Sequence, residues 1–218
     1  MALDGTYTGL QASVADFLNR ADLTATIPDF IALAEAQMNR QLQTREMWVL
    51  RTITVSEQSL ALPPDLMAVE SLQVQDNCVR KLRYLTPQQM DEKLINATGV
   101  PREYTVAGGC FVFWPTPEQA TQVRLRYRKI IDPLSAYNPS NWVLLKHPDA
   151  YLYGALLQTA PYLKDDDRLQ TWSGLYTSAL EQIETADRRI IGDSLEMRSG
   201  ISDRRHWPWY DSAYGYYP

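Results

Sequence analysis

The sequence is poor in the residues from which catalytic and metal sites are usually built. It holds two histidines, His147 and His206, and two cysteines, Cys78 and Cys110, among 218 residues. Both pairs are too widely spaced along the chain to form a local zinc-binding motif, and we find neither a glycine-rich phosphate loop nor a nucleophilic serine elbow. We therefore expect a protein that is not an enzyme, with no catalytic residue, no metal site and no cofactor, and two free thiols in a reducing compartment rather than a disulfide.

A surplus of basic charge and a long hydrophobic run are missing as well. The chain has 21 Lys and Arg residues against 26 Asp and Glu residues, a net charge of −5. Proteins that grip nucleic acid usually carry a basic excess, because phosphate contacts need Lys and Arg. The charge balance therefore argues against a DNA clamp and suits a surface past which DNA slides. No stretch approaches the roughly 18 apolar residues that a membrane span needs, and the first residues lack the features of a signal peptide, so we expect no membrane association.

Both ends of the chain show the period of amphipathic helices. Apolar residues recur every three or four positions over residues 8–20, 27–42 and 172–190, which predicts a helix at each place, the first capped by Thr8. The acidic turn at residues 164–167 precedes the last of these helices. We expect its carboxylates to cap that helix, and a divalent-cation site there is the weaker alternative.

The stretch from Ala150 to Leu157 is apolar on every side apart from two tyrosine hydroxyls. A helix that is apolar all round must be buried all round. A glycine in its middle costs roughly 1 kcal/mol of helix stability relative to alanine, so we expect this glycine to admit a close neighbouring backbone. The residues that we expect at an interface, either within a helical bundle or between the subunits of a ring, are Tyr151, Tyr153, Gly154, Trp172 and Tyr176.

Between the helical ends, the hydrophobic period changes to two residues. Residues 48–130 therefore predict an antiparallel sheet, with turns at Asp76–Asn77 and Gly108–Gly109 and a short helix from Thr86 to Ile95. The expected fold class is α+β: a helical bundle formed by the N- and C-terminal helices, an inserted antiparallel β-sheet, and an extended aromatic C-terminal arm. The expected segments are 1–47 for the N-terminal helices, 48–130 for the sheet, 131–193 for the C-terminal helices and 194–218 for the arm.

One predicted strand, over residues 122–130, alternates apolar and basic side chains. Its basic face would carry Arg124, Arg126 and Arg128, and the preceding hairpin could extend this band with residues 80, 81 and 83. The plainest interpretation is a solvated sheet face. The functional alternative is a charged band that pairs with acidic groups of a neighbouring subunit or partner. Direct DNA contact is a weaker third interpretation, because the chain as a whole has no basic surplus.

Residues 194–218 differ in composition from the rest of the chain. Aliphatic residues almost disappear, while six aromatic residues fall within the last twelve. Such a segment cannot build a core of its own, and exposed aromatic side chains would promote aggregation. We interpret it as a docking arm that orders against another protein; the alternative is a tail that folds back on its own domain. Its expected contact residues are Arg204, Arg205, Trp207, Trp209, Tyr210, Tyr214, Tyr216 and Tyr217.

Sequence blocks near both ends of the chain resemble a family of virion proteins. The C-terminal blocks are Pro148–Leu156, Ala160–Leu163, Asp166–Arg168, Trp172 and Asp187–Arg189, and the N-terminal blocks are Ile27–Ala36, Asn39–Arg40 and Glu46–Met47. They resemble the head-to-tail adaptor (connector) proteins of short-tailed bacteriophages, of the type found in phage SU10, which are more distantly similar to the tail tubular protein A group. The resemblance covers the helical ends, and the strands carry no family motif that we can identify.

The resemblance implies a structural protein of the virion neck, at the head–tail junction. Adaptors of this type form a homo-oligomeric ring, commonly a dodecamer, beneath the portal protein and join it to the tail tubular or nozzle protein. Their C-terminal segments commonly reach the portal or a neighbouring subunit. The ring seals the portal after genome packaging, and double-stranded DNA passes through it during ejection without sequence-specific binding. Before assembly, such a protein resides in the host bacterial cytoplasm. The alternative function is a non-viral scaffold or nucleic-acid-binding module.

Overall fold

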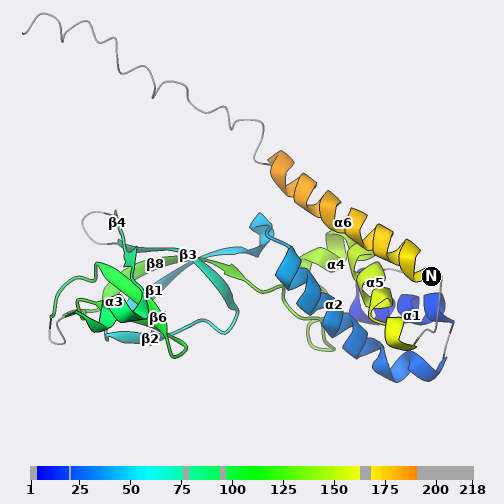
Figure 1. Cartoon of the computed structure of the whole chain (residues 1–218), viewed down its shortest axis with the longest axis horizontal. Helices are drawn as coiled ribbons and strands as arrows, with labels where there is room; N and C mark the ends of the chain where they lie inside the picture. The colour runs from blue at the N-terminus through cyan, green and yellow to red at the C-terminus, as the bar shows by residue number, and fades with distance from the viewer. Residues whose placement is uncertain (1–3, 20, 76–78, 94–96, 163–167, 191–218) are drawn as a thin grey trace, which may run out of the picture.

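Helices from both ends of the chain form one part of the molecule, and strands from its middle form the other (Figure 1). The computed structural model describes residues 4–19, 21–75, 79–93, 97–162 and 168–190, and the structural statements below refer to these residues. The mixed composition of helices and antiparallel sheets confirms the α+β class. The predicted arm, residues 194–218, lies outside the described residues, as does the acidic turn at residues 164–167.

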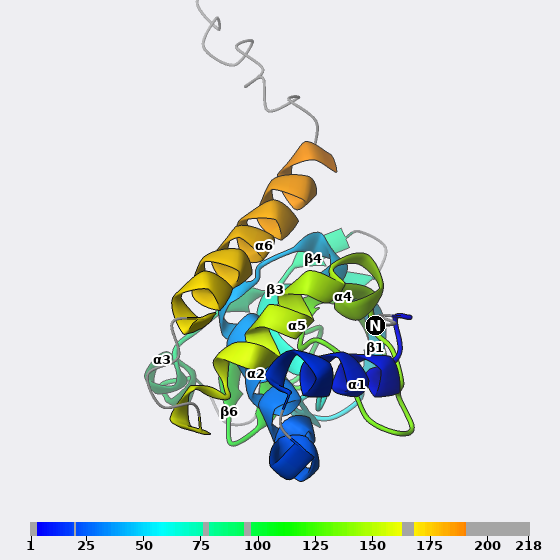
Figure 2. The ribbon, with the colours of Figure 1, turned by 90° about the vertical axis from the view of Figure 1, so that its right-hand side faces the viewer.

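The helical part is arranged around one central helix. Helix α5 packs against α1, α2, α4 and α6, and Figure 2 shows it between α6 and the two N-terminal helices. Thr6, rather than the predicted Thr8, caps α1, and its hydroxyl accepts a hydrogen bond from the Gly9 N–H at 3.1 Å. The elements are α1 (Tyr7–Leu18), the 3-10 helix η1 (Ala21–Thr26), α2 (Ile27–Gln41), η2 (Arg45–Met47), α4 (Trp142–Lys146), α5 (Pro148–Leu157), η3 (Ala160–Tyr162) and α6 (Arg168–Ile190).

The predicted apolar stripes of α2 and α6 form much of the helical core. Ile31, Ala34, Met38 and Leu42 are buried along and just after α2, and Trp172, Tyr176, Ala179 and Ile183 are buried along α6. The stripe on α6 ends earlier than the sequence predicts, because Ala186 is exposed where the last turns of the helix extend past the core (Figure 2). Arg45 holds this overhanging end: its N–H and Nε donate to Asp187 Oδ1 at 3.0 and 3.3 Å.

The strands form two four-stranded sheets instead of the single sheet that the sequence predicts. Leu72 and Tyr127 of the first sheet and Tyr104, Phe111 and Phe113 of the second belong to one buried cluster, so the sheets pack as a sandwich. The first has the order β1–β8–β3–β4 and is antiparallel, with β1 (Trp48–Val55), β8 (Thr121–Lys129), β3 (Leu66–Gln75) and β4 (Val79–Lys81). The second has the order β2–β7–β6–β5, with β2 (Ser59–Ala61), β7 (Cys110–Trp114), β6 (Glu103–Ala107) and β5 (Arg83–Tyr84), and β5 runs parallel to β6.

The predicted strand from Cys78 to Tyr84 is divided between the two sheets. β4 continues the hairpin with β3, whereas β5 joins the other sheet, and the buried Leu82 between them donates its N–H to the Leu72 carbonyl at 2.8 Å. The turn at Gly108–Gly109 is confirmed, with φ angles of 59° and 74° at the two glycines, as a tight hairpin requires. The short helix α3 (Pro87–Asp91) is shorter than predicted and starts with a capping box.

Candidate functional site

The five residues predicted at a bundle or ring interface lie in α5 and α6. Tyr151, Gly154, Trp172 and Tyr176 are buried inside the core of their own chain, and Tyr153 is partly buried against it. Packing within one chain therefore explains the apolar character of α5 without a contact between subunits.

Gly154 is placed where three helices meet. A Cβ atom on this residue would lie 3.0 Å from the Tyr176 ring and 3.3 Å from the Ala34 Cβ. The close neighbours are thus a ring of α6 and a side chain of α2, not the backbone that the sequence led us to expect. Any larger residue would have to push these helices apart.

A buried hydrogen-bond network joins α2 and α5 to the segment that returns from the sandwich. The Tyr151 hydroxyl donates to Glu35 Oε1 at 3.1 Å and accepts from Asn141 Nδ2 at 2.6 Å. Glu35 Oε1 also accepts from the Leu134 N–H at 2.8 Å, and Asn141 Nδ2 donates to the Asp132 carbonyl at 2.8 Å. The network fixes residues 132–141 on the helical core, and this role of Glu35 was not predicted from the sequence.

Burial shifts the ionisation of both acids in this network. Desolvation raises the pKa of Glu35, opposed by the hydrogen bonds from the Leu134 N–H and Tyr151. Desolvation also raises the pKa of Tyr151, and the nearby Glu35 carboxylate adds to that rise. Asn39 reinforces the same joint, because its Oδ1 accepts from the Ile131 N–H at 2.7 Å. The network therefore has a structural role, and its groups are enclosed rather than presented to a ligand.

The predicted arginine stripe lies on the outer face of the β1–β8–β3–β4 sheet. Its partners in the register are Trp48 and Ala68 beside Arg128, Leu50 and Ser71 beside Arg126, and Thr52 and Gln73 beside Arg124. Lys81 lies opposite Gln73 and continues the same row. We name the four cations Arg124, Arg126, Arg128 and Lys81 the arginine face. The predicted extension is wrong for Arg83, which belongs to the other sheet, and for Arg80, which lies opposite the buried Val74 and so falls in the inward-facing row.

Arg126 and Lys81 of the arginine face are exposed, whereas Arg124 and Arg128 are partly buried. Among the described residues, none of its four cations has an ion pair or hydrogen bond, and the buried Arg128 Nε has no partner. Glu70 lies in the irregularity between Val69 and Ser71 and is the one acidic residue of these four strands. Trp48 and Leu50 remain 39% and 50% exposed beside the arginines.

The free edge of β1 carries a charge in the inward-facing row. Arg51 lies opposite Leu125 in the register, between Val49 and Ile53, which pack against the sandwich core. Its side chain is nevertheless exposed, because β1 is the edge of its sheet. A charge at such a position discourages the addition of another strand.

The described part of the chain offers no assembled metal centre. No group of three or more His, Cys, Asp or Glu side chains there could hold a metal ion. His147 joins α4 to α5 without a capping hydrogen bond, and burial lowers its pKa. Cys110 is a free thiol. Cys78, His206 and the eight predicted arm residues Arg204, Arg205, Trp207, Trp209, Tyr210, Tyr214, Tyr216 and Tyr217 lie outside the described residues.

Comparison with known proteins gives one clear result. The profile of the SU10 adaptor protein family matches residues 5–198, which includes the helical part and the whole sandwich. No curated protein matches the chain. In the part of the chain that the structure describes, no helix is long and apolar enough to cross a membrane. Because the match spans most of the sequence, the chain belongs to the SU10 adaptor protein family of bacteriophages.

Proposed function

We propose that the protein is a structural head-to-tail adaptor of a tailed bacteriophage virion, located in the neck. In this proposal, copies of the chain form a ring beneath the portal protein, with twelve subunits as the expected number, and connect it to a tail tubular or nozzle protein. The match to the SU10 adaptor family over residues 5–198 carries the proposal. Assembly takes place in the host cytoplasm, and the finished ring is the conduit for DNA ejection.

The surface of the chain supports a role in assembly. The arginine face has exposed Trp48 and Leu50 beside it, and a combination of aromatic, aliphatic and arginine side chains is typical of protein interfaces. The charge of the whole chain, −5, supports a channel that passes DNA without holding it, because strong phosphate binding needs a basic surplus. The protein acts through shape and contact in this proposal, without catalysis.

Electron microscopy of the full-length chain mixed with the portal protein of the same phage tests this function. We expect a closed ring of the chain seated on the tail-facing end of the portal. A chain that stays monomeric and never associates with the portal would contradict the proposal.

Residues 194–218 are proposed as the docking arm of this adaptor, which contacts the portal or a neighbouring subunit. The variant W207A/W209A/Y210A should reduce association with the portal, because aromatic anchors commonly dominate binding energy. Tyr137→Ala is the matched control, since Tyr137 is a fully exposed tyrosine of the 131–141 segment. Unchanged portal association of the arm variant would refute the docking role.

A further inference from the structure

We infer that the sandwich is hinged on the helical part at two peptide links, Met47–Trp48 and Ile130–Ile131. In the described part of the chain, residues 48–130 form the sandwich together with α3, and the residues before and after them form the helical part. The chain therefore crosses between the two parts at these two links, which we name the hinge. The hinge is a property of the single chain, and only its use in a ring rests on the proposed function.

The first link passes from one packed body to the other within a single residue step. Met47 is fully buried in the helical cluster. Trp48, the next residue, already belongs to β1 and lies opposite Arg128, and Val49 packs against the sandwich core. Trp48 itself belongs to neither cluster and is 39% exposed, so close packing does not fix the chain at this point.

The second link changes from one body to the other just as abruptly. The Ile130 N–H donates to the Asp65 carbonyl, on the sandwich side, at 2.9 Å, and the Ile131 N–H donates to Asn39 Oδ1 of α2 at 2.7 Å. Ile131 is buried in the helical cluster, whereas Ile130 belongs to neither cluster. Residues at the ends of elements, between two well-packed bodies, are the usual places where changes in φ and ψ are absorbed. Both links have this position.

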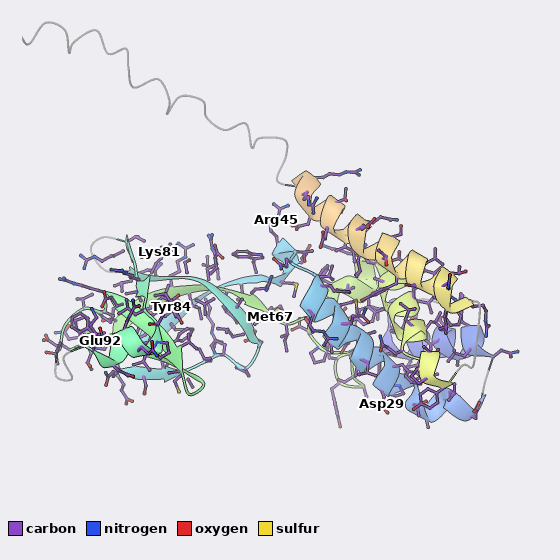
Figure 3. All side chains as sticks on the ribbon, viewed as in Figure 1. Asp29, Arg45, Met67, Lys81, Tyr84 and Glu92 are labelled. Carbon is purple, nitrogen blue, oxygen red and sulfur yellow. The ribbon has the colours of Figure 1, made fainter. Side chains whose placement is uncertain are left out.

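Little packing holds the sandwich at one angle. Among the described residues, Met67 of β3 is the only apolar side chain of residues 48–130 that packs against the helical cluster, and no helix of the helical part is closely packed against a strand. Figure 3 shows Met67 at the end of β3 nearest α2. Two bodies in one chain are expected to move relative to each other unless the interface between them is large and hydrophobic. Met67 is thus the contact that holds the resting angle of the hinge.

The two links lie on neighbouring strands, and this limits the direction of the motion. Trp48 and Arg128 are register partners, so the chain enters the sandwich on β1 beside the place where it leaves on β8. Two chains about 4.8 Å apart form a strip that bends across its face more easily than in its own plane. The hinge therefore swings the sandwich along the normal of the β1–β8–β3–β4 sheet. In the proposed ring, the sandwiches would follow a tail partner while the helical parts stay in place.

Distances between two spin labels on the unassembled full-length chain test the hinge. The labels are attached to introduced cysteines after Cys78→Ser and Cys110→Ser, and thermal unfolding establishes that each labelled chain folds. One pair of labels spans the hinge, at Ser59→Cys on β2 and Ser173→Cys on α6, where both serines are exposed. Two control pairs each lie within one part, at exposed positions: Ser59→Cys with Val79→Cys in the sandwich, and Ala12→Cys with Ser173→Cys in the helical part.

We expect the distance distribution across the hinge to be roughly twofold broader than either control distribution, because the hinge adds a motion that neither body has alone. Met67→Ala should broaden it further by removing the contact that holds the resting angle. Met90→Ala is the matched control, because it truncates a buried methionine of α3 away from the hinge and should leave the width unchanged.

Two results would overturn the inference. One is a distribution across the hinge that is as narrow as the two controls, and the other is an unchanged width in Met67→Ala. Because no portal is present in these measurements, failure of the hinge leaves the adaptor function standing, and failure of the chain to form rings on the portal leaves the hinge standing.

Discussion

The helical part and the sandwich are held together in different ways, although one chain builds both. The helical core is formed by long apolar stripes and includes a buried polar network that fixes the returning segment. The sandwich core is smaller, aromatic, and closed by two sheets. Their charges differ too: residues 48–130 have ten Lys and Arg against eight Asp and Glu, and the remaining residues have eleven against eighteen. The basic residues are thus concentrated in residues 48–130, although the chain as a whole is acidic.

Among the described residues, the two buried clusters have no side chain in common, so each should tolerate damage to the other. Phe111 is fully buried between the sheets. Phe111→Ala should therefore destabilise the sandwich by about 3–5 kcal/mol, the largest effect we expect. Hydrogen exchange should show faster exchange in the strands and unchanged protection in α2 and α5. Equal loss of protection in those helices would mean that the two parts unfold as one unit.

A substitution at Gly154, where three helices meet, tests the packing of the helical part. Gly154→Leu forces atoms against Tyr176 and Ala34 and should cost about 1–3 kcal/mol. Gly174→Leu on α6 is the matched control, because a Cβ atom there meets nothing within 4 Å and helix propensity favours leucine over glycine by roughly 1 kcal/mol. Thermal unfolding should therefore show a lower stability than wild type for Gly154→Leu and a higher one for Gly174→Leu. A stabilised Gly154→Leu would contradict the packing described.

The buried network should make the attachment of residues 132–141 to the helical core depend on one hydroxyl group, that of Tyr151. Tyr151→Phe removes the hydroxyl that connects Glu35 and Asn141 and should cost about 1–2 kcal/mol, since both partners keep another hydrogen bond. Chemical denaturation measures the loss, and hydrogen exchange should rise mainly in residues 132–141. A change confined to the strands would show that the network does not hold this segment.

The smallest effect expected is a change in pH dependence. Because burial raises the pKa of Glu35, its contribution to stability is greatest below the pKa of the unfolded chain and falls as the pH rises through the folded-state value. Glu35→Gln stays neutral and keeps one acceptor oxygen for the Leu134 N–H and Tyr151. The unfolding free energy of Glu35→Gln minus that of the wild type should therefore increase from acidic to neutral pH. A difference that is constant with pH would show that Glu35 is not desolvated as described.

The sequence predicted local features well where one short pattern decides the structure. The helical stripes, the Gly108–Gly109 turn and the alternation of Val123, Leu125 and Tyr127 with arginines all follow from such patterns. The division of residues 79–84 between two sheets was missed, because no local pattern separates the residues before Leu82 from those after it, and only tertiary packing decides which sheet each half joins.

The site was predictable only in part for a similar reason. Tyr151, Gly154 and Tyr176 were expected at an interface, but apolar periodicity cannot distinguish packing inside a chain from packing between chains. Glu35 was missed because its neighbours Leu134, Asn141 and Tyr151 lie about a hundred residues further along the chain, and no local pattern connects them. The placement of the arginines on the outer face of one of two packed sheets depends on the sandwich, which the sequence did not reveal.

The charge of Arg51, in the inward-facing row of the edge strand β1, limits how copies of this protein can associate. A strand that extended the sheet beyond β1 would have to desolvate the charged guanidinium of Arg51, which lies beside Tyr127, and this costs free energy. Growth by edge addition, which has no natural end and leads to fibrils, is therefore opposed at the longest open edge. Contacts between faces are not opposed by this charge, and they give a closed ring where the rotation between copies closes and an open filament where it does not.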